Sequence, residues 1–302
     1  MSKHTTMRFI ATNALSYCLS VFLIILITGV IVLRTVLNPL YILSRMEHSG
    51  FIEQSVIELR EVFISYGLGS GVERDTMASL ITEHHVVEAA EGIILQKYGR
   101  ESGFSFEAYI DEMYLVFYDY AISKGFQITE DIETGLFELA ELCANALSNH
   151  LDTLVISVLA QTQHYTRIIL IGVLVVSVFS LGVIIIIPFV NREVTRAIDS
   201  YLYAFGAAAI LCAAISIVYY STGLSTRLQI TPMSYKMLIS SWLDGIINGY
   251  LIALIITISL ILICVFAQLY KNKFFNRRLF SSVSGQRVIK KQNILHNIFR
   301  RD

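Results

Sequence analysis

The sequence predicts an all-α integral membrane protein with four transmembrane helices and a helical extracytoplasmic domain between the first and the second. Hydrophobic residues make up 55% of the 302 residues and charged residues only 16%, and the mean hydropathy is +0.62. Four long runs contain no charged side chain, and each exceeds the roughly 20 residues with which a helix crosses the hydrocarbon core. The same composition excludes a disordered chain and a secreted disulfide scaffold.

The boundaries of the predicted segments follow from these uncharged runs and from the charges beside them. The four spans are expected at residues 9–34, 167–191, 200–222 and 244–270. The other segments are an N-terminus at residues 1–8, an outer domain at 35–166, a loop at 192–199, an outer loop at 223–243 and a basic tail at 271–302. The first run is too long for the apolar part of a signal peptide, and no small-residue cleavage site follows it, so we expect it to be a span.

The distribution of charge predicts the orientation. Lys and Arg gather in the three short segments 1–8, 192–199 and 271–302, and the tail alone has nine of them. These segments share one side if every run crosses, and their basic residues predict that this side is the cytoplasm. The outer domain, by contrast, has 20 acidic and six basic residues. We therefore expect a multi-pass protein of the plasma (inner) membrane with both termini cytoplasmic.

The tail predicts a lipid partner. A basic segment next to a span is attracted to the negative cytoplasmic leaflet, so we expect the tail to lie against anionic lipid. Nucleic acid is not an expected partner, because the basic run starts where the fourth span ends. The outer domain has no Asn-x-Ser/Thr site, which favours a bacterial cell membrane over a eukaryotic secretory route.

The outer domain is expected to fold as an up-down four-helix bundle. Apolar residues at helical spacing predict helices at roughly 40–66, 73–98 and 105–124, each followed by glycine. A fourth helix begins at Thr129, a residue type that caps helix N-termini well. Its apolar stripe runs as far as Val158 without a breaker, towards the second span. An even number of helices returns the chain to the membrane with short loops.

Sites for chemistry are sparse. His84 and Glu88 are weak metal candidates, because they share one helix face and suit Zn or Fe. We favour a solvated polar face, since no second Glu-x-x-His supplies the remaining ligands of a di-iron bundle. The aromatic stretch 109–120 is interpreted as bundle core, with a ligand pocket as the alternative. The chain has no Walker loop, Gly-x-Ser-x-Gly or His-Glu-x-x-His, so we expect neither a cofactor nor an enzyme.

Small residues recur along the third and fourth spans and predict close helix packing. The two stripes are Gly206, Ala209 and Ala213 on the third span, and Ser241, Gly245, Gly249 and Ala253 on the fourth. Small side chains let helix backbones approach closely where no hydrophobic effect drives association. We expect the two stripes to pack against each other or against a second copy of the chain.

Two polar features at the ends of the spans are candidates for function. Asp244 stands at the outer end of the fourth span with Asn248 one turn deeper, and a buried acid in a span marks an ion or proton path. We favour a hydrated carboxylate at the membrane surface, because the cores of the spans carry no charge. The loop residues Arg192, Glu193 and Arg196 are candidates for docking a cytoplasmic partner.

These features together predict a non-enzymatic sensor, transmission or permease-like subunit. Its outer domain would bind a ligand or partner, and its spans would signal to a cytoplasmic ATPase or kinase, since its own cytoplasmic segments are short. The order of one span, an outer domain and three spans is similar to that of permease subunits of FtsX/MacB-type ABC systems. A bundle between two spans resembles chemoreceptor ectodomains. The alternatives are a homo-oligomeric channel or transporter and a structural or accessory envelope protein.

Overall fold

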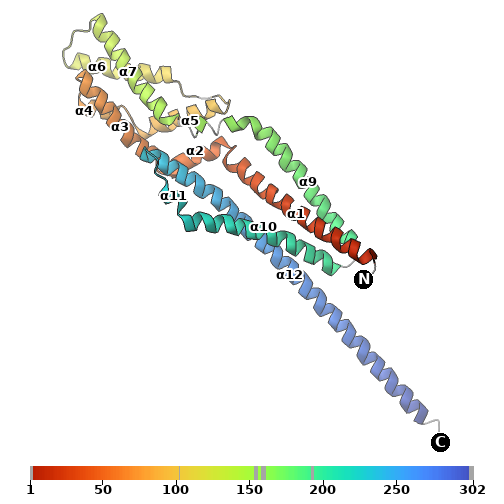
Figure 1. Cartoon of the computed structure of the whole chain (residues 1–302). Helices are drawn as coiled ribbons and strands as arrows, with labels where there is room; N and C mark the ends of the chain where they lie inside the picture. Colours follow the sequence, from red (N-terminus) through yellow and green to blue (C-terminus); the bar gives the residue numbers. More distant parts are fainter. Residues whose placement is uncertain (1–2, 102, 153–155, 158–160, 192–193, 299–302) are drawn as a thin grey trace. The chain divides into compact units, whose positions relative to one another are not determined.

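A computed structural model describes residues 3–101, 103–152, 156–157, 161–191 and 194–298, and every regular element within them is a helix (Figure 1). The first helix is α1 (Lys3–Thr35). The helices that follow it are α2 (Pro39–His48), α3 (Phe51–Ser70), α4 (Arg74–Ser79), α5 (Glu83–Lys97), α6 (Phe106–Ser123) and α7 (Glu130–Leu151). After the 3-10 turn η1 (Gln163–Tyr165) come α9 (Thr166–Asn191), α10 (Val194–Thr222), α11 (Leu224–Arg227) and α12 (Met233–Ile298).

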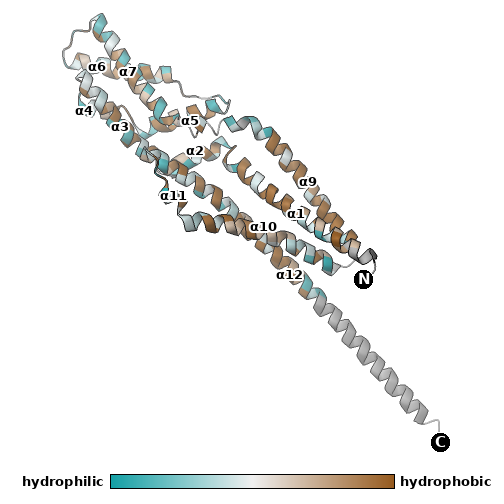
Figure 2. Cartoon of the chain, in the orientation of Figure 1, coloured by the Kyte–Doolittle hydropathy of each residue, from teal (hydrophilic) through white to brown (hydrophobic). Residues whose placement is uncertain are grey.

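Four stretches of helix are long and apolar enough to cross a membrane, judged by length and composition. They cover Phe9–Thr35, Thr166–Asn191, Thr195–Arg227 and Met233–Lys271. Figure 2 shows hydrophobic residues along α1, α9, α10 and the middle of α12, whereas α2 to α7 mix hydrophobic and hydrophilic residues. The four predicted spans are therefore present as apolar helices.

The last apolar helix starts earlier than the sequence predicts. α12 begins at Met233, well before the predicted start of the fourth span at Asp244. Residues 233–243, predicted as the end of an outer loop, are its first turns. The uncharged run cannot reveal this start, because Lys236 interrupts the apolar pattern. Leu238 is nevertheless buried in the core formed with α2 to α7. This packing stabilises the first turns of α12 and explains why the helix begins before the apolar run.

Two of the four helices predicted in the outer domain are each divided. Gly50 separates α2 from α3 with a φ of +76°, a left-handed conformation that glycine adopts without strain. The second division lies before α5, where the Thr82 side chain accepts a hydrogen bond from the backbone N–H of His85 and caps the helix. The fourth predicted helix is shorter than expected, because α7 ends at Leu151. Its predicted extension to Val158 includes positions outside the described residues.

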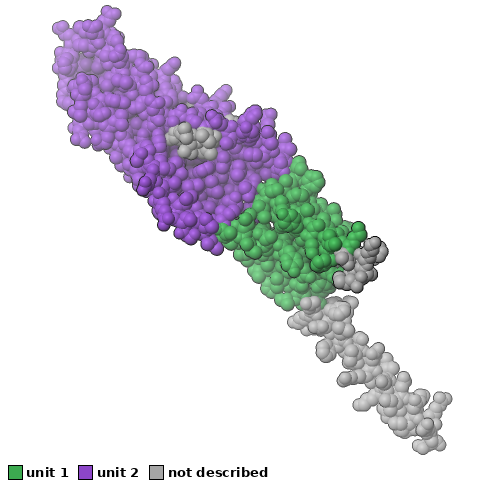
Figure 3. Space-filling view, in the orientation of Figure 1, with its two compact units in different colours: residues 1–26, 175–214, 251–302 green, residues 27–174, 215–250 purple. Residues whose placement is uncertain are grey.

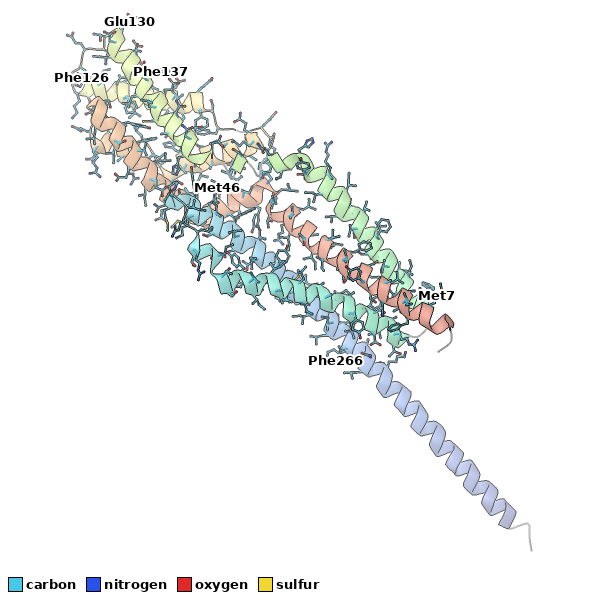
Figure 4. The ribbon with its side chains drawn as sticks, viewed as in Figure 1. Met7, Met46, Phe126, Glu130, Phe137 and Phe266 are labelled. Carbon is cyan, nitrogen blue, oxygen red and sulfur yellow. The ribbon has the colours of Figure 1, made fainter. Side chains whose placement is uncertain are left out.

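The predicted starts of α6 and α7 are confirmed. The side chains of Ser105 and Thr129 each accept a hydrogen bond from a backbone N–H in the first turn that follows. Gly125 follows α6 in the left-handed conformation of a C-terminal stop, as expected. Phe126 in the turn after α6 and Phe137 on α7 are both exposed (Figure 4). The turn after α6 and the helix α7 thus each expose an aromatic ring.

The chain forms two compact units, and the division falls within α1, α9, α10 and α12 (Figure 3). Unit 1 comprises residues 1–26, 175–214 and 251–302, and unit 2 comprises residues 27–174 and 215–250. The core of unit 1 joins α1, α9 and α10 through Leu19, Ile187 and Ala204. The core of unit 2 is larger and contains side chains of α2 to α7 together with the first turns of α12.

Candidate functional site

Side chains of α3, α7 and α12 meet at the start of α12, inside unit 2. Glu58 on α3 accepts hydrogen bonds from both the backbone N–H (3.1 Å) and the hydroxyl (2.6 Å) of Ser234 on α12. His150 near the end of α7 places its Nε2 3.6 Å from the Glu58 carboxylate and 3.5 Å from the Ser234 hydroxyl. Ser234 is fully buried, and the side chains of Glu58 and His150 are 19% and 13% exposed. These three residues are named the junction.

The geometry of the junction is that of a capped helix and differs from that of a catalytic triad. The Glu58 carboxylate accepts an N–H from the first turn of α12 and faces the positive end of its helix dipole. The hydroxyl proton of Ser234 goes to Glu58, so the contact with His150 needs the ring Nε2–H as its donor. In a triad the serine proton would go to the histidine nitrogen instead. The junction therefore holds helices together.

Aromatic and apolar contacts surround the junction. The hydroxyl of Tyr235 on α12 donates to the backbone carbonyl oxygen of His150. The centroid of the Tyr235 ring lies 5.5 Å from that of His150 and 6.3 Å from that of Phe51 on α3. Leu238, one turn further along α12, belongs to the same core as the residues of α2 to α7. The first turns of α12 are thus packed into the same core as α2 to α7.

Burial and hydrogen bonding change the acid–base behaviour of both titratable side chains. Burial raises the pKa of Glu58, but the hydrogen bonds from Ser234 and Gln54 outweigh it, and the pKa lies below its ordinary value of 4.5. Burial lowers the pKa of His150 from its ordinary value of 6.5, and the neighbouring carboxylate offsets only part of this change. At neutral pH the junction therefore pairs a carboxylate with a neutral imidazole.

The two predicted packing glycines of α12 lie against α1 and α2, inside unit 2. A Cβ added at Gly245 would overlap the hydroxyl oxygen of Tyr41 on α2. One added at Gly249 would lie 3.1 Å from Cγ1 of Ile31 on α1. The close neighbours of both glycines thus come from α1 and α2 and not from the stripe on α10.

The other small residues of the two stripes have more varied surroundings. Ser241 and Ala253 on α12 are half-buried, as is Ala213 on α10, whereas Ala209 on α10 is buried. An added Cβ at Gly206 would meet no described atom within 4 Å. Side chains of α1 and α2 therefore pack against the two glycines of α12, whereas Gly206 on α10 has open space beside it.

Asp244 has a partner on α10. The hydroxyl of Tyr219 donates to its Oδ1 at 2.6 Å. Nearby, the Ser240 hydroxyl donates to the carbonyl oxygen of Ser225 at 3.1 Å. Asn248, one turn beyond Asp244, is exposed. Asp244 therefore links α12 to α10, and Asn248 makes no comparable link among the described contacts.

The predicted docking loop is described in part. Arg192 and Glu193 lie outside the described residues, and Arg196 lies in the first turn of α10. In unit 1, two hydrogen bonds connect α12 to the same turns of α10: from Gln268 to Asp199 at 3.0 Å and from Lys271 to Thr195 at 3.2 Å. The part of α12 that lies in unit 1 is thus bound to the helix start that carries Arg196.

The weak metal candidates lie on the surface. The Nε2 atom of His84 is 3.4 Å from a carboxylate oxygen of Glu88, and their side chains are 75% and 51% exposed. Throughout the described part of the chain, no group of three or more His, Cys, Asp or Glu could hold a metal ion. Within the described residues, no third ligand of the kind that a zinc or iron site needs joins the pair.

A pocket of about 440 Å³ lies between α5 and α6. Its lining combines one histidine, three glutamates and two aromatic rings: His85, Glu88, Glu91, Glu112, Phe104 and Tyr109. The Nδ1 of His85 and the hydroxyl of Tyr109 lie 3.1 and 3.3 Å from the carbonyl oxygen of Leu80, which positions both rings. Burial raises the pKa of Tyr109 well above its ordinary value, so its hydroxyl stays protonated.

Sequence reasoning singled out some of these residues and missed others. It named Glu88 with His84, whereas the structure puts the next residue, His85, in the pocket beside Glu88. The junction was not predicted, because Glu58, His150 and Ser234 are far apart in the chain. One signal was present: Thr231 followed by Pro232 is a residue order typical of a helix start.

The fold defines the chain as a helical protein with four candidate membrane-spanning helices. Comparison with protein-family models, curated proteins and solved structures finds no match. The function has to be inferred from the chain's own residues.

Proposed function

We propose that the chain is a non-enzymatic transmission subunit of a cell membrane. In this proposal, α2 to α7 form an extracytoplasmic sensing domain, with α2–α3, α4–α5, α6 and α7 as the four arms of an up-down bundle. α12 passes the state of that domain to a cytoplasmic partner. The observation that carries the proposal is the junction, where a side chain of α3 caps the first turn of a helix apolar enough to cross a membrane.

The continuity of α12 supports this role. It is one helix from Met233 to Ile298, so a shift imposed at Ser234 is carried along its axis, as in other helix-shift mechanisms. Gln268 and Lys271 then bind the first turns of α10. These turns carry Arg196, which we propose as part of the partner's docking surface together with the loop before it.

The strength of the junction suits a reversible connection. Hydrogen bonds to a charged group contribute about 1.5–3 kcal/mol each. This is comparable with the few kcal/mol that separate two functional states of a protein. A modest change in α3 or α7 can therefore release or tighten the start of α12 without unfolding the domain.

Purification from native membranes tests the proposal. We expect the full chain, solubilised in mild detergent, to bring down a cytoplasmic ATPase or kinase in stoichiometric amount. Arg196→Ala should reduce the amount of that partner. Arg227→Ala is the control: it removes the same charge from the predicted outer loop and should leave the amount of partner unchanged. A lone homo-oligomer of fixed size would contradict the transmission role.

A second pair of variants tests the connection itself. Glu58→Gln should leave the partner bound but change its ATPase or kinase activity in reconstituted membranes. Glu61→Gln is the matched control, since Glu61 lies on the same helix with a side chain that is 70% exposed. Equal activity with wild type and Glu58→Gln would contradict a role of the junction in transmission.

A further inference from the structure

Pro188 lies within α9, one turn before this helix ends at Asn191. Proline has no N–H, so it cannot donate a hydrogen bond to the carbonyl oxygen of Ile184, four residues earlier in the helix. α9 is apolar enough to cross a membrane, and the hydrocarbon interior offers no water to replace the missing donor. The carbonyl of Ile184 therefore needs a donor from another helix.

Tyr201 on α10 supplies that donor. Its hydroxyl donates to the carbonyl oxygen of Ile184 at 2.6 Å. The Tyr201 ring packs against the core of unit 1 and stacks with Phe205, the two ring centroids being 6.5 Å apart. Ile184, Pro188 and Tyr201 all belong to unit 1, and these three residues are named the proline latch. The latch joins α9 to α10 at a turn where α9 lacks a hydrogen bond of its own.

The turn of α9 that follows Pro188 is incompletely hydrogen-bonded. The hydroxyl of Thr12 on α1 donates to Oδ1 of Asn191 at 2.7 Å. The amide nitrogen Nδ2 of Asn191 is buried and has no hydrogen-bond partner among the described residues. A buried donor without a partner destabilises the position that it occupies. The unpaired amide therefore lowers the free energy needed to move this turn to another position.

The first turns of α10 connect the proline latch to α12 within unit 1. Asp199 and Thr195 on α10 hold Gln268 and Lys271 of α12. Tyr201 comes two residues after Asp199 on the same helix. Because a helix has 3.6 residues per turn, side chains two residues apart point to nearly opposite faces. α10 thus holds α12 on one face and α9 on the other, so a shift of its first turns changes both contacts.

We propose that the proline latch controls a hinge in α9. While Tyr201 donates to Ile184, the last turn of α9 is held against α10. When α12 shifts the first turns of α10, this hydrogen bond breaks and α9 bends at Pro188, since helices hinge at prolines. The last turn of α9 precedes Arg196 by only a few residues, so the hinge acts beside the proposed docking surface. Its use as a signal rests on the proposed function, whereas the latch itself does not.

Amide hydrogen exchange in residues 184–191 of the purified full chain, in mild detergent, tests the inference. Tyr201→Phe removes the donor but keeps the ring, so exchange there should become about tenfold faster, equivalent to about 1.4 kcal/mol. Tyr203→Phe makes the same change on the same helix at a side chain that is 73% exposed, and it should exchange like wild type. Equal exchange in wild type and Tyr201→Phe would overturn the inference, as would equal acceleration in both variants.

Replacement of the proline distinguishes a latch from an ordinary contact between helices. Pro188→Ala restores an N–H that can donate to the carbonyl of Ile184, so the tyrosine hydroxyl is no longer needed. Adding Tyr201→Phe to Pro188→Ala should therefore change exchange in residues 184–191 by less than about twofold. A tenfold acceleration in this background as well would overturn the inference. Circular dichroism checks that all variants keep their helical content.

A variant of α12 tests the connection through α10. Gln268→Ala removes the hydrogen bond to Asp199 and should also speed exchange in residues 184–191. Ser259→Ala is the control, because the Ser259 hydroxyl bonds to the carbonyl oxygen of Ile255 on α12 itself. Equal exchange in these two variants would overturn the control of the hinge by α12. Because exchange is measured on the isolated chain, a latch without a cytoplasmic partner contradicts only the proposed function, and a partner without a latch contradicts only this inference.

Discussion

The junction and the pocket lie in the same unit and contain the same residue types, glutamate and histidine, but the glutamates differ in their partners. At the junction, Glu58 accepts hydrogen bonds from Ser234 and, at 3.0 Å, from Gln54. In the pocket, Glu91 accepts none from any described residue. Glu58 is largely buried and needs protein donors, whereas Glu91 is exposed and can be hydrated. The comparison separates a carboxylate that holds helices together from one that faces solvent.

The largest loss of stability is expected from Glu58→Ala. The substitution leaves the buried N–H and hydroxyl of Ser234 without their acceptor, so the free energy of unfolding should fall by about 2–3 kcal/mol. Thermal unfolding of the full chain in detergent, followed by circular dichroism, measures the change. Glu61→Ala, at an exposed position of the same helix, should stay within about 0.5 kcal/mol of wild type. Equal losses in the two variants would contradict the structural role of Glu58.

A smaller loss is expected from Gly245→Ala, which tests how tightly α12 is held beyond the junction. The new Cβ overlaps Tyr41, whose ring also lies 5.0 Å from the Arg45 guanidinium. Overpacking of this kind should lower the free energy of unfolding by about 1–2 kcal/mol. Gly206→Ala adds the same methyl group beside open space and should cause no loss. Similar melting temperatures for the two variants would show that α12 is not closely packed there.

Acidification should loosen the junction through His150 before it affects Glu58. Burial holds the pKa of His150 below 6.5 in the folded chain, so the ring binds a proton more readily in the unfolded chain. The junction therefore loses stability as the pH falls below 6.5. Glu58, with a pKa below 4.5, adds its loss only at lower pH. Fluorescence of Trp242, the single tryptophan, should shift to the red between about pH 7 and about pH 5. The same shift in His150→Gln would exclude His150 as its cause.

The smallest effect on stability is expected from Glu91→Gln. No described group donates to this carboxylate, so neutralising it should change the free energy of unfolding by less than about 0.5 kcal/mol. Thermal unfolding beside wild type measures this difference. A loss as large as that of Glu58→Ala would show that Glu91 is a structural residue, and the comparison between the two carboxylates would then fail.

Local sequence signals predicted much of the fold. Uncharged runs predicted the four apolar helices, and apolar spacing predicted a helix from residue 105. The residue types at Thr129 and Gly125 predicted where α7 begins and where α6 stops. These signals are local, because capping and hydropathy act within a few residues. The start of α12 was missed because its first turns carry Lys236 and pack into the domain core, an environment that hydropathy does not report.

The candidate sites were less predictable, because they depend on contacts between distant segments. The spacing of Gly245 and Gly249 indicated a close helix contact, but it could not name Ile31 and Tyr41 as the neighbours. His150 looked isolated in the sequence, and only the fold brings it to Glu58. His84 and His85 are adjacent on α5, but only His85 lines the pocket.

Amide hydrogen exchange of the full chain tests the central claim most directly. In Glu58→Gln, exchange should become faster both in the first turns of α12, residues 233–243, and at the end of α7, because the junction joins these helices to α3. Glu61→Gln should exchange like wild type in both regions. Faster exchange confined to α3, or the same pattern in both variants, would contradict the claim that the junction connects α3 and α7 to α12.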